Sequence, residues 1–213
     1  EVGTGKTILI HTLLSSLPEK IKTAFIFHPT FSLEELLERV LDELGETGSP
    51  GETGRAPEHL VAYLGVLRDR GEMLAVCIDE AQRLSEVVIR GLVSLLAREV
   101  WVSEVFQLVL VGQPELEPLL EDVWRRYRPE APGINVRIGP LSETEAREYI
   151  FHRLRIAGGD ATALFSPQAL TLITGYARGI PRVINNVANN ALLVGYSESL
   201  KKIEAPVIRE VIE

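Results

Sequence analysis

The chain has 213 residues, 46% hydrophobic and 24% charged, which is the balance of an ordinary globular protein with one large or two smaller domains. Its formal net charge of −8 argues against a protein that binds nucleic acid through overall positive charge. The single cysteine, Cys77, excludes a disulfide within the chain, which fits a reducing, cytoplasmic location. Because Cys77 lies within the apolar run 74–78, we expect a small core residue rather than a nucleophile.

Apolar periodicity, capping residues and turn residues predict the elements in chain order. The chain begins inside a glycine-rich segment, so we expect a fragment whose preceding strand is missing. The expected elements are a helix at 7–17, a strand at 23–27, a helix from the Ser32–Glu35 capping box to near residue 45, a loop at 45–57, a helix at 57–70, a strand at 74–78, a helix from Ser85 to near residue 97, a strand at 107–111, and a short fourth strand at Val136–Ile138.

Strands that alternate with helices predict an α/β layer with a mainly parallel sheet. After Pro140 the pattern contains only helices. They begin at the Ser142–Glu145 capping box, at Ser166-Pro167 and near Ile180. The sequence therefore predicts an α/β domain over residues 1–140 and a small all-helical domain over 141–213.

The segment Gly3-Thr4-Gly5-Lys6-Thr7 supplies all of the phosphate-loop pattern G-x-x-x-x-G-K-[ST] except its first glycine. Glycines let backbone N–H groups converge on phosphate oxygens, and the start of the following helix favours an anion. Lys6 is expected to neutralise β- and γ-phosphate charge, and the Thr7 hydroxyl to ligate Mg²⁺. The predicted nucleotide contacts are Gly3, Thr4, Gly5, Lys6, Thr7 and Ile8. The alternative is a flexible turn before a helix, and a second motif later in the chain favours the phosphate loop over it.

That second motif is an apolar strand, 74–78, followed by Asp79 and Glu80. A carboxylate at the end of a parallel strand can hold Mg²⁺ or its waters, so Asp79 is the second predicted metal ligand. Glu80 is then placed to activate the attacking water as a general base. Gln113 directly follows the third strand and can hydrogen-bond the γ-phosphate or that water; the alternative is a turn residue before Pro114.

Two groups of arginines are further candidates. Arg182 lies at the start of a predicted helix, where its fork of donors suits a γ-phosphate, although it could instead pair with an acidic neighbour. Arg125, Arg126 and Arg128 cluster within four positions, which is equally typical of a solvated helix end.

Four segments occur in an order that resembles a known family: residues 1–7, Ile-Asp-Glu-Ala-Gln (78–82), Leu-Val-Gly-Gln-Pro-Glu-Leu (110–116) and Gly-Ile-Pro-Arg-Val-Ile-Asn (179–185). Together they resemble the general secretion pathway protein A (ExeA-like) group of AAA+ ATPases. The resemblance implies a P-loop NTPase fold, with a parallel sheet flanked by helices and followed by a helical lid. It also implies ATP hydrolysis with Mg²⁺.

The resemblance further implies roles for single residues. Gly3–Thr7 correspond to Walker A, Asp79 and Glu80 to Walker B, Gln113 to sensor 1 and Arg182 to sensor 2. An arginine finger is expected from a neighbouring subunit, and Arg126 is the preferred candidate within its cluster. A homo-oligomer, ring or multimer, is the implied assembly.

The implied partner is a component of a bacterial secretion or cell-envelope system, with the domain in the cytoplasm, at the inner membrane through regions outside this chain. One alternative is a DNA-transposition regulator, which the acidic charge disfavours. Another is a nucleotide-dependent scaffold with little turnover. The missing first strand would fill the slot between the strands that carry Gln113 and Val136–Ile138, so this fragment is expected to bind ATP poorly.

Overall fold

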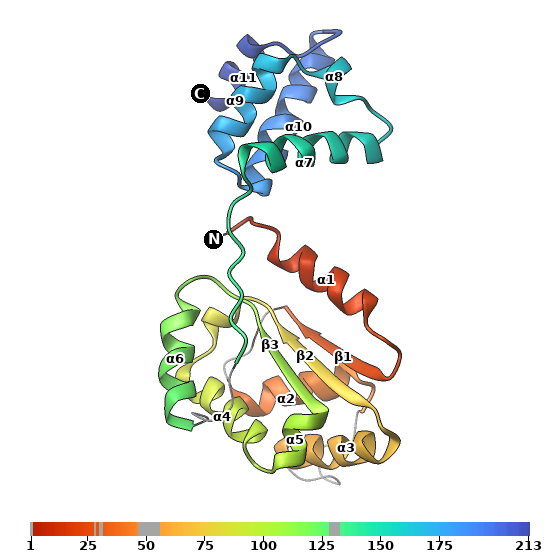
Figure 1. Cartoon of the computed structure of the whole chain (residues 1–213), viewed down its shortest axis with the longest axis vertical. Helices are drawn as coiled ribbons and strands as arrows, with labels where there is room; N and C mark the ends of the chain where they lie inside the picture. Colours follow the sequence, from red (N-terminus) through yellow and green to blue (C-terminus); the bar gives the residue numbers. More distant parts are fainter. Residues whose placement is uncertain (1, 28, 30–31, 47–55, 128–132) are drawn as a thin grey trace. The chain divides into compact units, whose positions relative to one another are not determined.

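The computed structural model describes residues 2–27, 29, 32–46, 56–127 and 133–213. Contacts between residues divide the chain into two compact units. The sheet unit comprises Thr7–Asn135, and the helical unit combines the first six residues with Val136–Glu213 (Figure 1). Most of the loop expected at 45–57 lies outside the described residues, and the domain boundary after residue 140 stays a prediction.

Three parallel strands form the sheet in the order β1-β2-β3. They are β1 (Ile21–Ile26), β2 (Met73–Ile78) and β3 (Phe106–Leu110). In their register Phe25 lies opposite Cys77, and Cys77 opposite Val109. This arrangement confirms the predicted α/β fold with a parallel sheet.

The described residues of this part of the chain also form the helices α1 (Lys6–Ser16), α2 (Leu33–Glu43), α3 (Ala56–Arg70), α4 (Glu86–Leu96), α5 (Val100–Val105) and α6 (Leu116–Tyr127), and the 3₁₀ turn η1 (Ala81–Arg83). Ser32 and Ser85 cap α2 and α4 as predicted, each accepting a backbone N–H in the first turn. Helices α5 and α6 were not expected from the sequence.

The main core lies on one face of the sheet, against α2, α3 and α5 (Figure 1). Alternate strand residues point to it, among them Ile26, Val76 and Phe106. The opposite face carries Phe25, Cys77 and Val109, and His11 of α1 contacts Phe25 there with ring centroids 4.7 Å apart. Cys77 is buried as expected, and burial raises the pKa of its thiol to about 11.

The predicted fourth strand at Val136–Ile138 is wrong. Within the described residues β3 pairs with β2 alone, so its second edge has no strand beside it. Val136–Ile138 forms no bridge, and Val136 is 74% exposed. A segment of three residues becomes a strand only beside another strand, and among the described residues no strand pairs with Val136–Ile138.

The helical unit contains α7 (Glu143–Ile156), α8 (Ala161–Leu164), α9 (Pro167–Ala177), α10 (Pro181–Ser197) and α11 (Ala205–Ile212). The capping box of Ser142 and Glu145 starts α7, and Ser166 caps α9, both as predicted. The core of this unit is formed chiefly by α7, α9, α10 and α11 around residues such as Ile173. No helix formed by the described residues is long and apolar enough to span a bilayer.

Gly179, the first residue of the Gly-Ile-Pro-Arg segment, fits a place where two backbones cross. Its φ is +75°, and its carbonyl accepts the N–H of Leu141 at 2.8 Å. A Cβ atom at this position would lie 2.0 Å from the carbonyl oxygen of Leu141. Only glycine therefore permits the segment that enters α7 to pass so close to the start of α10.

Candidate functional site

The loop that leads into α1 turns on two glycines. Gly3 and Gly5 have φ angles of +85° and +95°, a region that side chains rarely adopt, while Thr4 between them is buried. Helix α1 begins directly afterwards at Lys6. Because the first N–H groups of a helix have no partner within it, this loop has the local form of an anion-binding turn.

Thr7 and Asp79 join the start of α1 to the end of β2. The Thr7 hydroxyl donates a hydrogen bond to Asp79 Oδ2 at 2.5 Å, across 72 residues of sequence. Asp79 is 1% exposed, and its other oxygen accepts the N–H of Glu80 at 2.8 Å. Both oxygens of this buried carboxylate are thus hydrogen-bonded, as burial of a charged group requires. Since the hydroxyl gives its only hydrogen to Asp79, both lone pairs of Thr7 Oγ1 remain for another ligand.

This donor set fits Mg²⁺. Hydroxyl and carboxylate oxygens are the ligands that Mg²⁺ prefers, and in nucleotide sites it uses one or two side chains together with phosphate oxygens and water. The part of the chain that the structure describes contains no group of three or more His, Cys, Asp or Glu able to hold a metal ion. Two protein oxygens are fewer than the octahedral shell of Mg²⁺ requires, so phosphate oxygens and water would have to supply the rest.

Glu80 adopts a left-handed backbone, with φ 54° and ψ 34°, at the start of the 3₁₀ turn η1. For a residue with a side chain this conformation costs about 1–2 kcal/mol, so surrounding contacts must hold it. The N–H of Glu80 is bound to Asp79, and its carbonyl accepts the N–H of Arg83 at 2.9 Å. Strained backbone of this kind collects at functional positions.

Gln82 connects Glu80 with the loop after β3. Its side-chain nitrogen donates to Glu80 Oε2 at 2.8 Å, and its side-chain oxygen accepts the N–H of Gln113 at 3.1 Å. The predicted residues Thr7, Asp79, Glu80 and Gln113 are therefore brought together at the carboxyl edge of the sheet. Gln82 was not among the predicted site residues, although it belongs to the Ile-Asp-Glu-Ala-Gln segment that carries the family resemblance.

Arg182 and Gly3 meet within the helical unit. The N–H of Arg182, in the first turn of α10, donates to the Gly3 carbonyl at 3.2 Å. A Cβ atom on Gly3 would lie 2.8 Å from Cβ of Arg182 and 3.2 Å from Cγ2 of Ile180. The glycine of the loop is thus required by its close approach to α10 as well as by its φ angle.

The arginine cluster lies on the last turn of α6. Arg126 forms an ion pair with Asp122 at 2.9 Å, one turn earlier, and its side chain is 60% exposed. Arg125 is also exposed, whereas Arg128 lies outside the described residues. An exposed pair within one helix contributes little to stability. The role of Arg126 as an arginine finger remains a prediction. Ile8 is 69% exposed, and its role as a nucleotide contact also remains a prediction.

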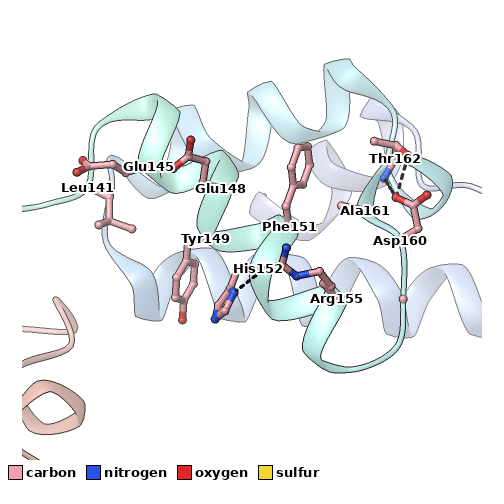
Figure 2. A pocket seen from close by; sticks show the side chains of 11 residues that line it. Leu141, Glu145, Glu148, Tyr149, Phe151, His152, Arg155, Asp160, Ala161 and Thr162 are labelled. Atoms are coloured by element: carbon pink, nitrogen blue, oxygen red, sulfur yellow. Dashed lines mark hydrogen bonds between the residues drawn. The ribbon is translucent and has the colours of Figure 1, made fainter. Parts of the chain in front are cut away.

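A separate pocket of about 820 Å³ lies on the helical unit (Figure 2). It contains none of the predicted site residues, and two of its acidic side chains stabilise the starts of helices. Glu145 closes the capping box with Ser142, and Asp160 accepts hydrogen bonds from Thr162; these bonds lower the pKa of both carboxyls. The pocket's arginine, Arg155, contacts a histidine on its own helix, as the dashed line in Figure 2 marks. The predicted site residues therefore lie outside this pocket.

Comparisons with known proteins agree with the fold. A family model described as "AAA domain" matches residues 1–120. General secretion pathway protein A of Aeromonas hydrophila is 32% identical over 208 residues, which cover 95% of this chain and 37% of that protein. The chain thus spans little more than a third of this curated relative.

Two solved structures show the same fold. Cdc6p of Pyrobaculum aerophilum superposes with a TM-score of 0.72 at 18% identity, over 94% of this chain and 55% of that one. The ORC2 protein of Aeropyrum pernix, solved as ADPNP and ADP complexes, gives a TM-score of 0.72 at 17% identity, over 99% of this chain and 58% of that one. By its motifs, its parallel sheet and the family model, this chain belongs to the AAA domain family, the AAA+ group of P-loop nucleotide-binding proteins.

Proposed function

We propose that the chain binds ATP with Mg²⁺ through the loop Gly3–Thr7 and hydrolyses it at the carboxyl edge of the sheet. The observation that carries this proposal is the 2.5 Å hydrogen bond between Thr7 and Asp79. It unites the last residue of the phosphate loop with the carboxylate that follows β2, which is the pair of oxygens that a nucleotide-bound Mg²⁺ needs.

The other predicted site residues have different roles in ATP hydrolysis, which follow from their chemistry. Lys6 and Arg182 neutralise phosphate charge, and Glu80 accepts the proton of the attacking water. Gln113 orients that water or the γ-phosphate with its amide. When bound, Mg²⁺ supplies charge neutralisation at the phosphate oxygens. Catalysis of this kind consists of positioning and electrostatic stabilisation, which a preformed set of hydrogen-bonded side chains provides.

Two substitutions test the site in the complete protein. Glu80→Gln should reduce ATP turnover by at least about 100-fold while ATP affinity is retained, because only the proton acceptor is removed. Lys6→Ala should abolish binding as well as turnover. Glu104→Gln, at an exposed glutamate of α5, is the matched control and should leave the rate unchanged. Equal turnover in Glu80→Gln and wild type would refute hydrolysis at this site, and full turnover in Lys6→Ala would refute the loop assignment.

The proposed active form is a homo-oligomer in which Arg126 of one subunit reaches the ATP of its neighbour. Arg126→Ala should bind ATP normally but turn it over slowly. Mixing it with Lys6→Ala subunits should restore part of the rate, because a Lys6→Ala subunit offers an intact Arg126 to a neighbour with an intact loop. A mixture no faster than the sum of its components would exclude Arg126 as a residue that acts between subunits.

The proposed cellular role is to energise or regulate assembly of a bacterial secretion or cell-envelope system. The support is the similarity to General secretion pathway protein A over 95% of this chain. A Glu80→Gln allele at the native locus should arrest export of proteins or surface polymers while the protein itself remains at its normal level. Unimpaired export in that strain would refute this role without affecting the proposed chemistry.

A further inference from the structure

Both the nitrogen and the oxygen of the Gln82 side-chain amide form hydrogen bonds, and the two partners follow different strands of the sheet. Its nitrogen donates to Glu80 Oε2 at 2.8 Å, and its oxygen accepts the N–H of Gln113 at 3.1 Å. Glu80 follows β2, whereas Gln113 follows β3. One half-buried side chain thus spans from the predicted general base to the loop that carries the predicted sensor.

The orientation of this amide follows from its partners. A backbone N–H can only donate, so Gln113 requires the amide oxygen. A carboxylate oxygen opposite the amide needs a donor, so Glu80 requires the amide nitrogen. Rotating the amide by half a turn would place two donors face to face and two acceptors face to face. Gln82 is therefore fixed in one orientation, and each of its bonds supports the other.

The backbone around Gln82 is shaped to admit this contact. A Cβ atom on Gly112 would lie 2.8 Å from Gln82 Oε1 and 2.9 Å from Cδ2 of Leu116, so a side chain at position 112 would displace the amide. Two main-chain bonds, from Ala81 N–H to the Val111 carbonyl and from Val111 N–H to the Ile78 carbonyl, both 2.9 Å, hold the same two loops together. The loops are thus already docked, and what Gln82 adds is control over the Glu80 carboxylate.

Glu80 has a left-handed backbone, φ 54°, which is strained for a residue with a side chain and persists only where surrounding contacts hold it. We propose that Gln82 is a positioning residue for ATP hydrolysis: it holds the carboxylate of Glu80 in a fixed relation to Gln113, so that base and sensor act as one unit. This inference rests on the proposed hydrolysis of ATP and extends it by one residue that touches the base but not the nucleotide.

Two substitutions separate the two bonds. Gln82→Glu keeps an oxygen that can accept the Gln113 N–H but sets a second carboxylate against Glu80. Gln82→Met has a similar length and removes both bonds. If Gln82 positions Glu80, both variants should lower kcat on the order of 10–100-fold, the size of effect that misplacement of a catalytic group produces. KM and the affinity for ADP should change by less than roughly threefold, because ground-state binding is untouched.

Two further measurements distinguish positioning from simple structural support. The melting temperatures of both variants should stay close to wild type, and Gln168→Glu, at an exposed glutamine of α9, controls for the added charge. In a Glu80→Gln background, Gln82→Met should cause no additional loss of rate, because residues that act as a unit are not additive.

The outcomes are distinct. A Gln82→Glu variant with wild-type kcat beside an impaired Gln82→Met would show that Gln82 only pins the Gln113 loop, and the inference would be overturned. Losses that multiply in the Glu80→Gln background, or that come with lost ADP affinity and a lower melting temperature, would overturn it as well. If both Gln82 variants turn over at full rate while Glu80→Gln is inactive, only this inference fails. If wild type itself does not hydrolyse ATP, the proposed function fails and the inference with it.

Discussion

Replacing Thr7 by Val tests the junction between the phosphate loop and β2 without changing the shape of the side chain. In the absence of nucleotide, the substitution removes the donor at 2.5 Å from Asp79 Oδ2 and leaves a carboxylate that is 1% exposed with one oxygen unpaired. Hydrogen bonds to charged groups contribute about 1.5–3 kcal/mol to stability. Because Thr7 is half-exposed, water can replace part of the lost hydrogen bond to Asp79. We expect a loss of about 2 kcal/mol, equivalent to a melting temperature lower by about 4–8 °C for a chain of this size.

Urea denaturation of wild type, Thr7→Val and Thr7→Ser measures this loss. Thr7→Ser retains the hydroxyl and should stay within about 0.5 kcal/mol of wild type, whereas in an Asp79→Asn background the cost of Thr7→Val should shrink. Nucleotide affinity of Thr7→Val should also lose its dependence on Mg²⁺, since the lone pairs of the hydroxyl are gone. A Thr7→Val protein as stable as wild type would refute the argument that this bond sustains the buried Asp79.

Three other substitutions probe the helical unit. Gly179→Ala should destabilise it by about 2–5 kcal/mol, because a positive φ and a contact at 2.0 Å with the Leu141 carbonyl both oppose a side chain. Gly175→Ala, inside α9 where nothing lies within 4 Å of the new methyl group, should instead be neutral or stabilising, and similar urea midpoints for the two variants would contradict the structure. Hydrogen bonds from Ser142 lower the pKa of Glu145, so the stability they add is complete above the ordinary value of 4.5 and is lost as the pH falls through the lowered pKa. Glu145→Gln keeps the capping box without a titrating group, and its melting temperature should converge with that of wild type as the pH falls below 4.5. A difference that stays constant with pH would argue against this role.

Local chemistry made much of the fold predictable. Each capping serine accepts a hydrogen bond from the backbone three residues later. Helix starts at Ser85, Ser142 and Ser166 could therefore be predicted without any knowledge of tertiary structure. The meeting of Thr7 with Asp79 was also predictable, because a strand that ends in an acid and a loop that opens a helix converge at one edge of a parallel sheet.

Features that depend on neighbours were harder to predict. Helix α6 contains Pro118 in its first turn, where no backbone donor is needed, and the surrounding turn residues obscured its start. Val136–Ile138 has the composition of a strand, but no strand of the described chain pairs with it. Gln82 carries no signal by itself, since its role arises only because Gln113, 31 positions later, returns to it.

The bare edge of β3 has a practical consequence for handling the protein. Within the described residues no strand covers this edge, and Ile8, Leu9 and Leu13 of helix α1 are exposed in the same unit. Strand edges with free backbone N–H and C=O groups, and exposed aliphatic side chains, both promote self-association of proteins. Preparations of these 213 residues should therefore scatter more light as concentration rises, and charged substitutions at Leu9 and Leu13 should suppress that scattering.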